Sequence, residues 1–346
     1  MQLYTVDPLQ DSRWDALVAS HSQASAFHHR GWLKALATTY GYRPVVFTTT
    51  PPDMPLWDGL VFCEVESWIT GRRLVSLPFA DHADPLLNQR VEGIKMEDWA
   101  PVECHAHRWK YIEFRPLSER IQPASPLRES RVFWFHSLCL APSIDRMFAK
   151  LHKSCFQRRI QHAERERMTY ERGDSDALLD AFYRLMVATR KRQGLIPQPR
   201  AWFRNLITSL RPNAEIRLLR KDGAPVAAIF TLRHRRINVF KYGCSDEGFH
   251  HLGGMPLLFW NLIVESKTEG AEQIDFGRTD VDNEGLIQFK DRLGAIRRKI
   301  NYFRYSEARK QGDLVARCLP VSKNLFAALP QALSPIVGNL VYRHIA

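Results

Sequence analysis

The stretch Ala214–Arg304 decides the fold of this chain. It opens with three apolar runs: EIRLLR at Glu215–Arg220, VAAIFTLR at Val226–Arg233 and INVFKY at Ile237–Tyr242. An Asp-Gly turn joins the first two runs and a short hairpin joins the last two. The runs therefore predict three antiparallel strands.

A glycine loop and a helix follow the third strand. The loop is Ser245–Gly254, and Pro256 opens an apolar helix that Gly270 closes. Gln273–Gly277 then predicts one more strand. Strands and helices in this order predict an α/β (α+β) fold with mixed, mostly antiparallel sheets and flanking helices.

The first half of the chain repeats this rhythm. Its expected elements are the strands Tyr42–Thr49, Leu60–Glu66 and Arg73–Phe79, the helix Asn88–Trp99 and the returning strand Lys110–Arg115. Residue identity between the halves is low, so the similarity lies in the order of elements. We expect two units of one type in tandem, at 1–145 and 146–306, followed by a helical C-terminal tail at 307–346.

The composition is that of a globular protein with a strong positive charge. The 346 residues are 45% hydrophobic and 25% charged, and the formal net charge is +12. Basic residues concentrate in the second half, which favours polyanions such as tRNA, a nucleotide- or lipid-linked pyrophosphate, or an anionic membrane face. A basic protein without such a partner is the alternative.

No targeting or membrane-spanning signal is visible. The start lacks a basic region followed by an apolar run, and no apolar stretch reaches about 18 residues. We expect a cytoplasmic protein, with peripheral membrane contact as an open alternative. In the tail, Pro320, Pro330 and Pro335 favour short helices that cap the second domain over one amphipathic membrane helix.

Metal sites are not expected. The six cysteines show no CxxC spacing, and most lie in apolar runs, which favours buried reduced thiols. Cys104–His107 is the one metal-like cluster, and it has no second half for zinc. Asp280 and Asp282 lack the rest of a calcium loop.

A basic helix is expected at Met147–Met168, between the two units. Phe156, Ile160 and Ala163 share one face, and Arg158, His162 and Arg165 lie nearly opposite. The stripe that contains Arg158 and Arg165 has the charge to hold phosphates. A solvated helix face explains it equally well.

Two further segments predict a site in the second half. His250, Gly253 and Gly254 precede a helix N-terminus, where free backbone N–H groups attract phosphate, although the glycines could simply permit a tight turn. Asp275 and Arg278 end the following strand, where α/β folds often place binding residues, although a structural ion pair explains them as well.

Several motifs together resemble the FemAB-like proteins, a GNAT-superfamily group of tandem acyltransferases that includes BioF2-like members. The motifs are LPFADHADP at Leu77–Pro85, the basic helix Lys153–Arg167, YGCSD at Tyr242–Asp246, DFGR at Asp275–Arg278 and FKDRLG at Phe289–Gly294. The resemblance covers the chain up to about Ser306. It implies two tandem GNAT-like acyltransferase domains.

The resemblance also implies an activity. FemAB-like enzymes pass an acyl or aminoacyl group to an amine of a cell-envelope precursor, here an anionic peptidoglycan or polysaccharide precursor linked to a nucleotide or lipid pyrophosphate. The donor is acyl-CoA or aminoacyl-tRNA, and no cofactor is tightly bound. Two alternatives stay open: an acetyl-CoA-dependent N-acetyltransferase acting on a nucleotide sugar, and a non-catalytic basic adaptor in polysaccharide assembly.

Site residues follow from the matching positions. In the acetyl-CoA loop of GNAT enzymes, Arg/Gln-x-x-Gly-x-Gly/Ala, His250 takes the first place and Met255 the last. Lys290 matches the phosphate-binding lysine of a Phe-Lys-x-x-Phe-Gly motif. We expect Lys241 and Arg278 to bind substrate or phosphate as well, and Asp81, His82 or Asp275 to manage the proton of the acceptor.

Overall fold

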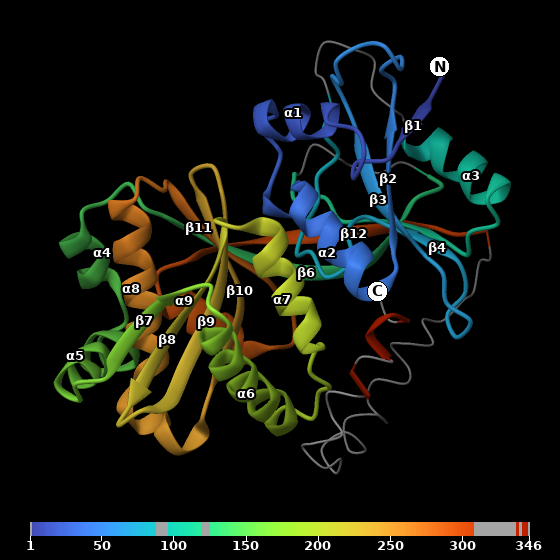
Figure 1. Cartoon of the computed structure of the whole chain (residues 1–346). Coiled ribbons are helices and arrows are strands. Elements are labelled where there is room, and N and C mark those ends of the chain that lie inside the picture. The colour runs from blue at the N-terminus through green and yellow to red at the C-terminus, as the bar shows by residue number, and fades with distance from the viewer. Residues whose placement is uncertain (1, 88–95, 119–124, 308–336, 339–340, 345–346) are drawn as a thin grey trace. The chain divides into compact units, whose positions relative to one another are not determined.

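A computed structural model describes residues 2–87, 96–118, 125–307, 337–338 and 341–344. Its contacts divide the chain into two compact units (Figure 1). The first unit comprises Met1–Val132, Ile300–Val321 and Asn339–Ala346, and the second comprises Phe133–Lys299 and Ser322–Gly338. Each unit is described by itself below.

The first unit contains a six-stranded sheet. Its elements are β1 (Tyr4–Val6), α1 (Arg13–Ser20), η1 (Ala26–His28), α2 (Arg30–Tyr40), β2 (Arg43–Thr48), β3 (Leu60–Val65), β4 (Arg73–Val75), α3 (Met96–Ala106), β5 (Ile112–Phe114) and β12 (Ile296–Tyr305). The strand order is β1-β2-β3-β4-β5-β12. Neighbours are antiparallel except β4 and β5, which are parallel.

The second unit contains the matching sheet and more helices. Its elements are β6 (Arg128–Cys139), α4 (Ile144–Lys150), η2 (Lys153–Gln157), α5 (Arg158–Arg165), β7 (Thr169–Gly173), α6 (Asp176–Arg192), α7 (Arg200–Leu210), β8 (Ala214–Lys221), β9 (Ala224–His234), β10 (Ile237–Ser245), η3 (Glu247–Leu252), α8 (Gly254–Thr268), β11 (Gln273–Asp280) and α9 (Glu284–Arg292). The strand order is β6-β11-β10-β9-β8-β7.

The two units share one topology. In each, three antiparallel strands lead to a helix, and the next strand returns parallel to the third: β2-β3-β4, α3 and β5 in the first, and β8-β9-β10, α8 and β11 in the second. An antiparallel strand then flanks the returning one, β12 beside β5 and β6 beside β11. The predicted fold class, a mixed and mostly antiparallel tandem architecture, is confirmed.

Each sheet is completed by a strand segment that is distant in the sequence from most of its unit. Residues Phe133–Cys139 of β6 come directly after Val132, the last residue of the first unit's long segment, and pair with β11 of the second unit. Conversely, β12 follows the second unit and pairs with β5 of the first. The domain limits expected at 145 and 306 stay a prediction.

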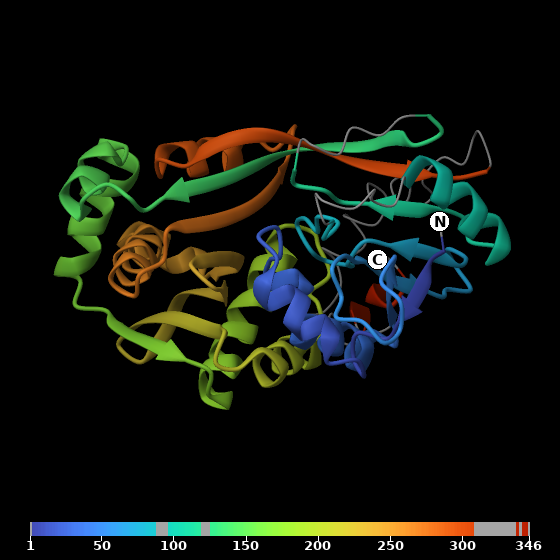
Figure 2. The same ribbon diagram turned by 90° about the horizontal axis from the view of Figure 1, so that it is seen from above.

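Helices cover both faces of the second unit's sheet. α5 and α8 pack against each other and α8 packs on β8 and β9, whereas α6 packs on β9 and β10 (Figures 1 and 2). Ile229 of β9 belongs to the core under α8, and its neighbour Phe230 contacts Phe182 of α6. Successive residues of β9 thus bury opposite faces, as a central strand requires.

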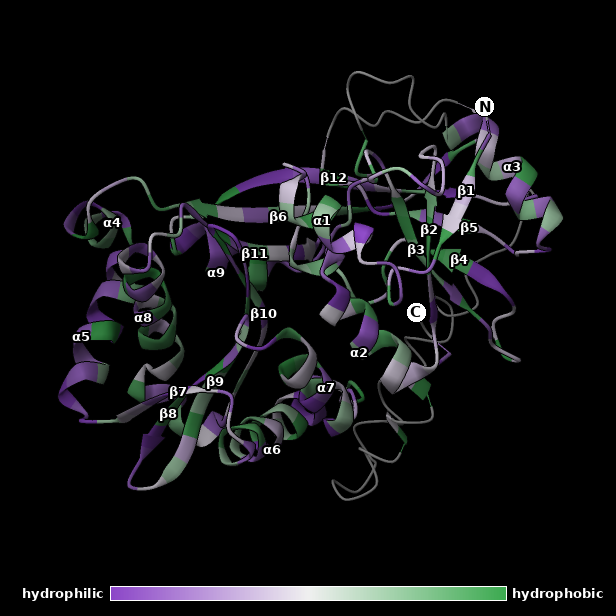
Figure 3. Ribbon diagram, turned by 45° about the horizontal axis from the view of Figure 1, so that its top comes forward, coloured by the Kyte–Doolittle hydropathy of each residue, from purple (hydrophilic) through white to green (hydrophobic). Residues whose placement is uncertain are grey.

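The predicted helix Met147–Met168 is broken in the structure. Leu151 and His152 are extended, and the ring of His152 accepts a hydrogen bond from the Cys155 amide, 3.3 Å away, where η2 begins. The His152 side chain thus caps the helical segment that begins at Lys153, and the preceding helix ends at Lys150. The expected face is confirmed, because Phe156, Ile160 and Ala163 are buried, and Figure 3 shows α5 as mostly hydrophilic with a hydrophobic patch.

Two other expectations concern the ends of the chain and the thiols. Among the described tail residues, the carbonyls of Tyr342 and His344 accept hydrogen bonds from Tyr42 and Thr70 of the first unit, which differs from the expected capping of the second domain. Most of the tail, and the start of the helix expected at Asn88–Trp99, lie outside the described residues.

The five described cysteines are free thiols, and three of them are buried.

Candidate functional site

The central feature of the second unit is a separation between two parallel strands. β10 and β11 pair only from Ile237 opposite Gln273 to Val239 opposite Asp275. Beyond that point β10 stays paired with β9, and β11 stays paired with β6. The sheet therefore splits at the carboxyl ends of two parallel strands, where α/β folds bind ligands.

A β-bulge lies where this separation begins. The register of β10 against β9 shifts between Phe240 and Tyr242, so Lys241 is the extra residue. Its ammonium lies 5.6 Å from the centre of the Tyr242 ring. Bulges bend a strand and often occur beside active sites. The predicted substrate residue Lys241 thus marks the point where β10 leaves β11.

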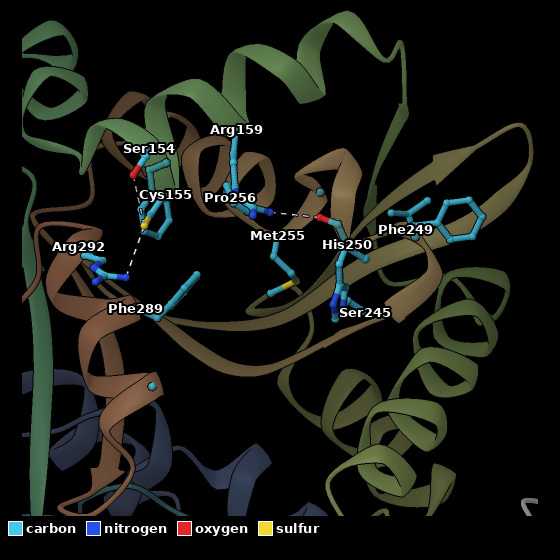
Figure 4. Close-up of a pocket in the computed structure, with 15 residues that line it drawn as sticks. Ser154, Cys155, Arg159, Ser245, Phe249, His250, Met255, Pro256, Phe289 and Arg292 are labelled. Atoms are coloured by element: carbon cyan, nitrogen blue, oxygen red, sulfur yellow. Dashed lines mark hydrogen bonds between the residues drawn. The ribbon is translucent and has the colours of Figure 1, made fainter.

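A cavity of about 720 Å³ extends from the end of β10 to α9, the helix that follows β11 (Figure 4). Its lining is mostly apolar, with three basic side chains among the polar ones. The lining residues are Ser154, Cys155, Phe156, Arg159, Val226, Ala227, Ser245, Phe249, His250, Gly254, Met255, Pro256, Gly285, Phe289 and Arg292. This size and composition are typical of a site for a small molecule.

The N-terminus of α8 forms part of the cavity wall. Gly254 and Met255 open this helix, so their N–H groups have no acceptor within it. Two of the three predicted donor-loop residues, His250 and Gly254, line the same cavity. Amide groups at a helix N-terminus favour an anion in this position.

Gly253 fixes the loop against the backbone of α5. Its φ of +75° lies in the left-handed region, and a Cβ there would come within 2.6 Å of the Arg159 carbonyl oxygen. Any larger residue would therefore be strained and would also push the loop away from α5. The structure thus shows the tight turn expected of the glycines, and phosphate binding by this loop stays a prediction.

His250 is neutral at neutral pH. Burial, assisted by the charge of Arg192, lowers the pKa of this imidazole from its ordinary 6.5. Its Nε2 lies 2.9 Å from the hydroxyl of Ser245. The residue that takes the arginine position of the acetyl-CoA motif therefore contributes a polar ring and no charge.

Two arginines line the cavity from other elements. Arg159 of α5 donates from Nη1 to the His250 carbonyl at 3.3 Å, and Arg292 of α9 donates to the Cys155 sulfur at 3.5 Å (Figure 4). Within the described part of the chain, neither guanidinium is paired with a carboxylate. Sequence reasoning missed both, although the position of Arg159, three residues after buried Phe156, brings it to the edge of the packed face.

The other large polar pocket of this unit is a closed ion network. It has a volume of about 360 Å³ and includes Arg172, Arg217 and Arg233. These arginines pair with Glu215, Glu265 and Glu269. Since the guanidinium groups and carboxylates satisfy one another, we assign this pocket a structural role.

Lys290 does not lie in the cavity. Its side chain is 3% exposed, and its ammonium donates to the carbonyl of Phe276 at 2.7 Å and to the hydroxyl of Thr279 at 2.8 Å. The carbonyls of Gly277 and Arg278 lie 3.4 and 3.3 Å away. This geometry favours a structural role over the expected phosphate contact, because the ammonium is engaged by β11.

Asp275 and Arg278 lie at the irregular part of β11. The register of this strand against β6 shifts between these residues, and Gly277 has a φ of +67° within the irregularity. The carboxylate of buried Asp275 accepts the Gly277 N–H at 2.6 Å. Arg278 lies over the Phe133 ring at 4.3 Å. Neither of them lines the cavity, so the role expected of each stays a prediction.

The remaining predicted residues lie on exposed or separate surfaces. Arg158 and Arg165 are exposed on α5 and are absent from the cavity lining. Asp81 and His82 belong to the first unit, where the Asp81 carbonyl accepts the Tyr302 hydroxyl at 2.6 Å. The His82 ring is buried edge-on against Phe27, at 5.2 Å between centres.

The described residues show neither a metal cluster nor a membrane span. No group of three or more potential metal ligands occurs among them. No helix in the described segments is long and apolar enough to cross a membrane.

Residues 151–291 match a family of known sequences, the acetyltransferase (GNAT) domain. The matched segment contains the separated strands, the loop at Gly253 and every residue that lines the cavity except Arg292. This part of the second unit is a GNAT-type acetyltransferase domain, which supports an acyltransferase enzyme. No curated protein matches the chain in sequence.

Solved structures share the fold over almost the whole chain. FemX has a TM-score of 0.69 at 14% identity, covering 88% of this chain and 97% of FemX. L-PGS from Bacillus licheniformis has a TM-score of 0.54 at 14% identity, with 92% and 96% covered. A tandem GNAT protein from the clavulanic acid biosynthesis pathway has a TM-score of 0.52 at 12% identity, with 90% and 100% covered. The FemAB-like tandem GNAT fold expected from the motifs is confirmed.

Proposed function

We propose that this protein transfers an acyl group from an acyl-CoA donor, bound in the 720 Å³ cavity, to an amine of an anionic cell-envelope precursor. The observation that carries the proposal is the position of the cavity. It lies at the N-terminus of α8, next to the separation of β10 from β11. Such a position suits both the phosphates of the donor and the extended arm of the donor that carries the thioester.

The cavity divides chemically in a way that suits a thioester with phosphates. The amides at Gly254 and the guanidinium of Arg159 suit a diphosphate. Phe156, Met255 and Phe289 offer apolar contact to the arm that carries the thioester. The donor would therefore extend from the α8 N-terminus along the cavity toward α9.

The chemical step needs little from the protein. The amine nitrogen attacks the thioester carbonyl, a C–N bond replaces the C–S bond, and the amine loses a proton. Backbone N–H groups next to a bulge can stabilise the oxyanion that forms. The bulge at Lys241 lies where β10 leaves β11, which favours it as the place for the reacting carbonyl.

The acceptor assignment is supported by the motifs and by charge. The FemAB-like motifs imply an envelope precursor, and the net charge of +12 suits one that carries pyrophosphate. Peripheral contact with an anionic membrane would fit a lipid-linked precursor.

Binding of CoA to the purified protein tests the donor assignment. At a hundredfold excess over Kd, CoA is expected to raise the free energy of unfolding by about 2.7 kcal/mol, measured as a shift in thermal midpoint. Gly285→Leu should abolish this shift. Gly285 lines the cavity, and a Cβ there meets nothing within 4 Å, so a larger side chain can be attached at this point of the cavity wall.

Aminoacyl-tRNA provides the comparison for this test. If it stabilised the protein and CoA did not, the acyl-CoA donor would be rejected. With CoA bound, release of free thiol from acetyl-CoA in the presence of candidate amine precursors then identifies the acceptor class.

A further inference from the structure

We propose that Arg159, on α5, supplies the phosphate-binding cation that the donor loop itself lacks. The inference rests on the proposed function for the identity of the donor, and it assigns to one side chain the contact with the diphosphate. Sequence motifs place such a cation within the loop. The structure offers it from a different element.

The first step is the loop residue. Position 250 is where the acetyl-CoA motif has arginine or glutamine, and here it is a histidine. The imidazole lies 2.9 Å from the Ser245 hydroxyl, and burial lowers its pKa. At neutral pH the loop therefore presents to the cavity amide N–H groups and the neutral ring of His250.

The second step is the state of the Arg159 side chain. It lines the cavity, and in the described residues its guanidinium has no carboxylate partner. Its one hydrogen bond goes from Nη1 to the His250 carbonyl at 3.3 Å. A guanidinium carries five N–H donors, so the others are available for a ligand.

The third step is the fixed geometry between α5 and the loop. The Arg159 carbonyl would meet a Cβ at position 253 at 2.6 Å, so backbone lies directly on backbone. The guanidinium reaches over the same loop to the His250 carbonyl (Figure 4). Amides and cation are thus held together before a ligand arrives, which lowers the entropic cost of binding.

The other cations near the cavity do not meet these conditions. Arg292 lies at the opposite end, beside Cys155 and Phe289 (Figure 4). Arg158 precedes Arg159 on the same helix and is exposed, but it does not line the cavity. The assignment therefore selects one of two adjacent arginines with the same charge.

A diphosphate is the ligand that this arrangement fits. The planar fork of a guanidinium can bind two oxygens of one phosphate group, and helix N–H groups can bind the next. Inorganic pyrophosphate contains this group alone, without adenosine or pantetheine. It therefore tests the cation independently of the rest of the donor.

The experiment compares Arg159→Gln with Arg158→Gln in the full chain by calorimetric titration with inorganic pyrophosphate. Arg159→Gln is expected to weaken binding at least tenfold, and Arg158→Gln less than twofold. Arg159→Lys should recover part of the loss, because it keeps the charge and loses the planar fork. Since both side chains are exposed, thermal midpoints should stay within a degree of the parent protein.

Equal losses in the two glutamine variants would mean a general charge effect and would overturn the inference. An unchanged affinity in Arg159→Gln, or no binding of pyrophosphate to the parent protein, would overturn it as well. A parallel titration with CoA separates the two proposals. Arg159-dependent binding of pyrophosphate without any binding of CoA would uphold the cation and reject the acyl-CoA donor.

Discussion

Gly253 is the residue at which the donor loop meets α5, and two separate requirements fall on it. The left-handed φ of +75° favours glycine at any position. The Arg159 carbonyl, 2.6 Å from where a Cβ would lie, adds a steric requirement specific to this contact. Gly270 has a similar φ of +78° but nothing within 4 Å, so it carries the first requirement alone.

Alanine at these two glycines separates the requirements. Gly270→Ala is expected to lower the free energy of unfolding by about 1 kcal/mol, through backbone strain alone. Gly253→Ala should lower it by about 3 kcal/mol and also weaken pyrophosphate binding, because the loop must leave α5. Urea denaturation and calorimetry measure the two effects. Equal destabilisation by both changes would show that the contact with α5 contributes nothing.

The sequence predicted the position of the donor loop, but it did not predict which basic side chain lies next to that loop. His250 and Gly254, which were expected in the donor loop, both line one cavity, and their contact with a donor stays a prediction. Arg158 and Arg159 are adjacent arginines on one expected helix, and only the packing of α5 on the loop decides which of them faces the ligand. For Lys290 the expected phosphate contact stays a prediction, and its motif does not show that β11 contains an irregularity whose carbonyls engage the ammonium.

At the scale of elements, Lys290 joins α9 to β11. Irregular strand segments turn carbonyls out of the ladder, and buried carbonyls need donors. Lys290 donates to the Phe276 carbonyl and to the Thr279 hydroxyl, and the same helix presents Phe289 and Arg292 to the cavity. The ammonium therefore positions one wall of the site without touching it.

Lys290→Met removes the donor while keeping most of the side-chain volume. We expect the free energy of unfolding to fall by about 2 kcal/mol, since buried carbonyls lose their partner. Affinity for pyrophosphate should change less than for Arg159→Gln. Arg292→Met on the same helix is the control and should leave stability unchanged, because its side chain is exposed. Unaltered stability of Lys290→Met, together with lost pyrophosphate binding, would restore the phosphate-binding role.

Most strands and helices were predictable, because alternation and turn residues are local signals. The break in the basic helix expected at Met147–Met168 was not predictable, because it depends on the ring of His152 capping the helical turn that follows. The separation of β10 from β11 was also hidden, since each strand keeps its apolar pattern while changing neighbours. Pairing between distant segments does not appear in a local pattern.

At the scale of the whole molecule, acid affects the two units through different groups. In the second unit, burial beside Lys290 lowers the pKa of His136 from 6.5 to about 4, against the opposing charge of Asp291. Arg297 also faces this ring and lowers its pKa. In the first unit, burial raises the pKa of Glu113, but Arg115 and Arg304 outweigh it and bring the pKa from 4.5 to about 2.

Both lowered pKa values predict a loss of stability as the pH falls, in separate windows. His136 contributes stability above pH 6.5 that is lost between pH 6.5 and about 4. Glu113 contributes, on the order of 3 kcal/mol, above pH 4.5, and this is lost as the pH falls toward about 2. In each case the unfolded chain takes up the proton first.

Two substitutions test these windows by urea denaturation across the pH range. His136→Phe should be more stable than the parent protein at pH 5, with little difference at pH 8, because it has no proton to take up. Glu113→Gln should lower stability at pH 7 and flatten the curve below pH 4.5. Parallel curves for the parent protein and both variants would contradict the assignment.

The exchange of flanking strands between the two units has a consequence for biosynthesis. A ribosome completes β12, which pairs with β5 of the first unit, only after the strands and helices of the second unit have been made. The second unit already has β6 when its own segment emerges, so all strands of its sheet are present once β11 is made. The first unit is translated first, but the edge of its sheet at β5 stays unpaired until residues 303–305 have been synthesised. The order in which the two sheets are completed is therefore the reverse of the order in which they are translated.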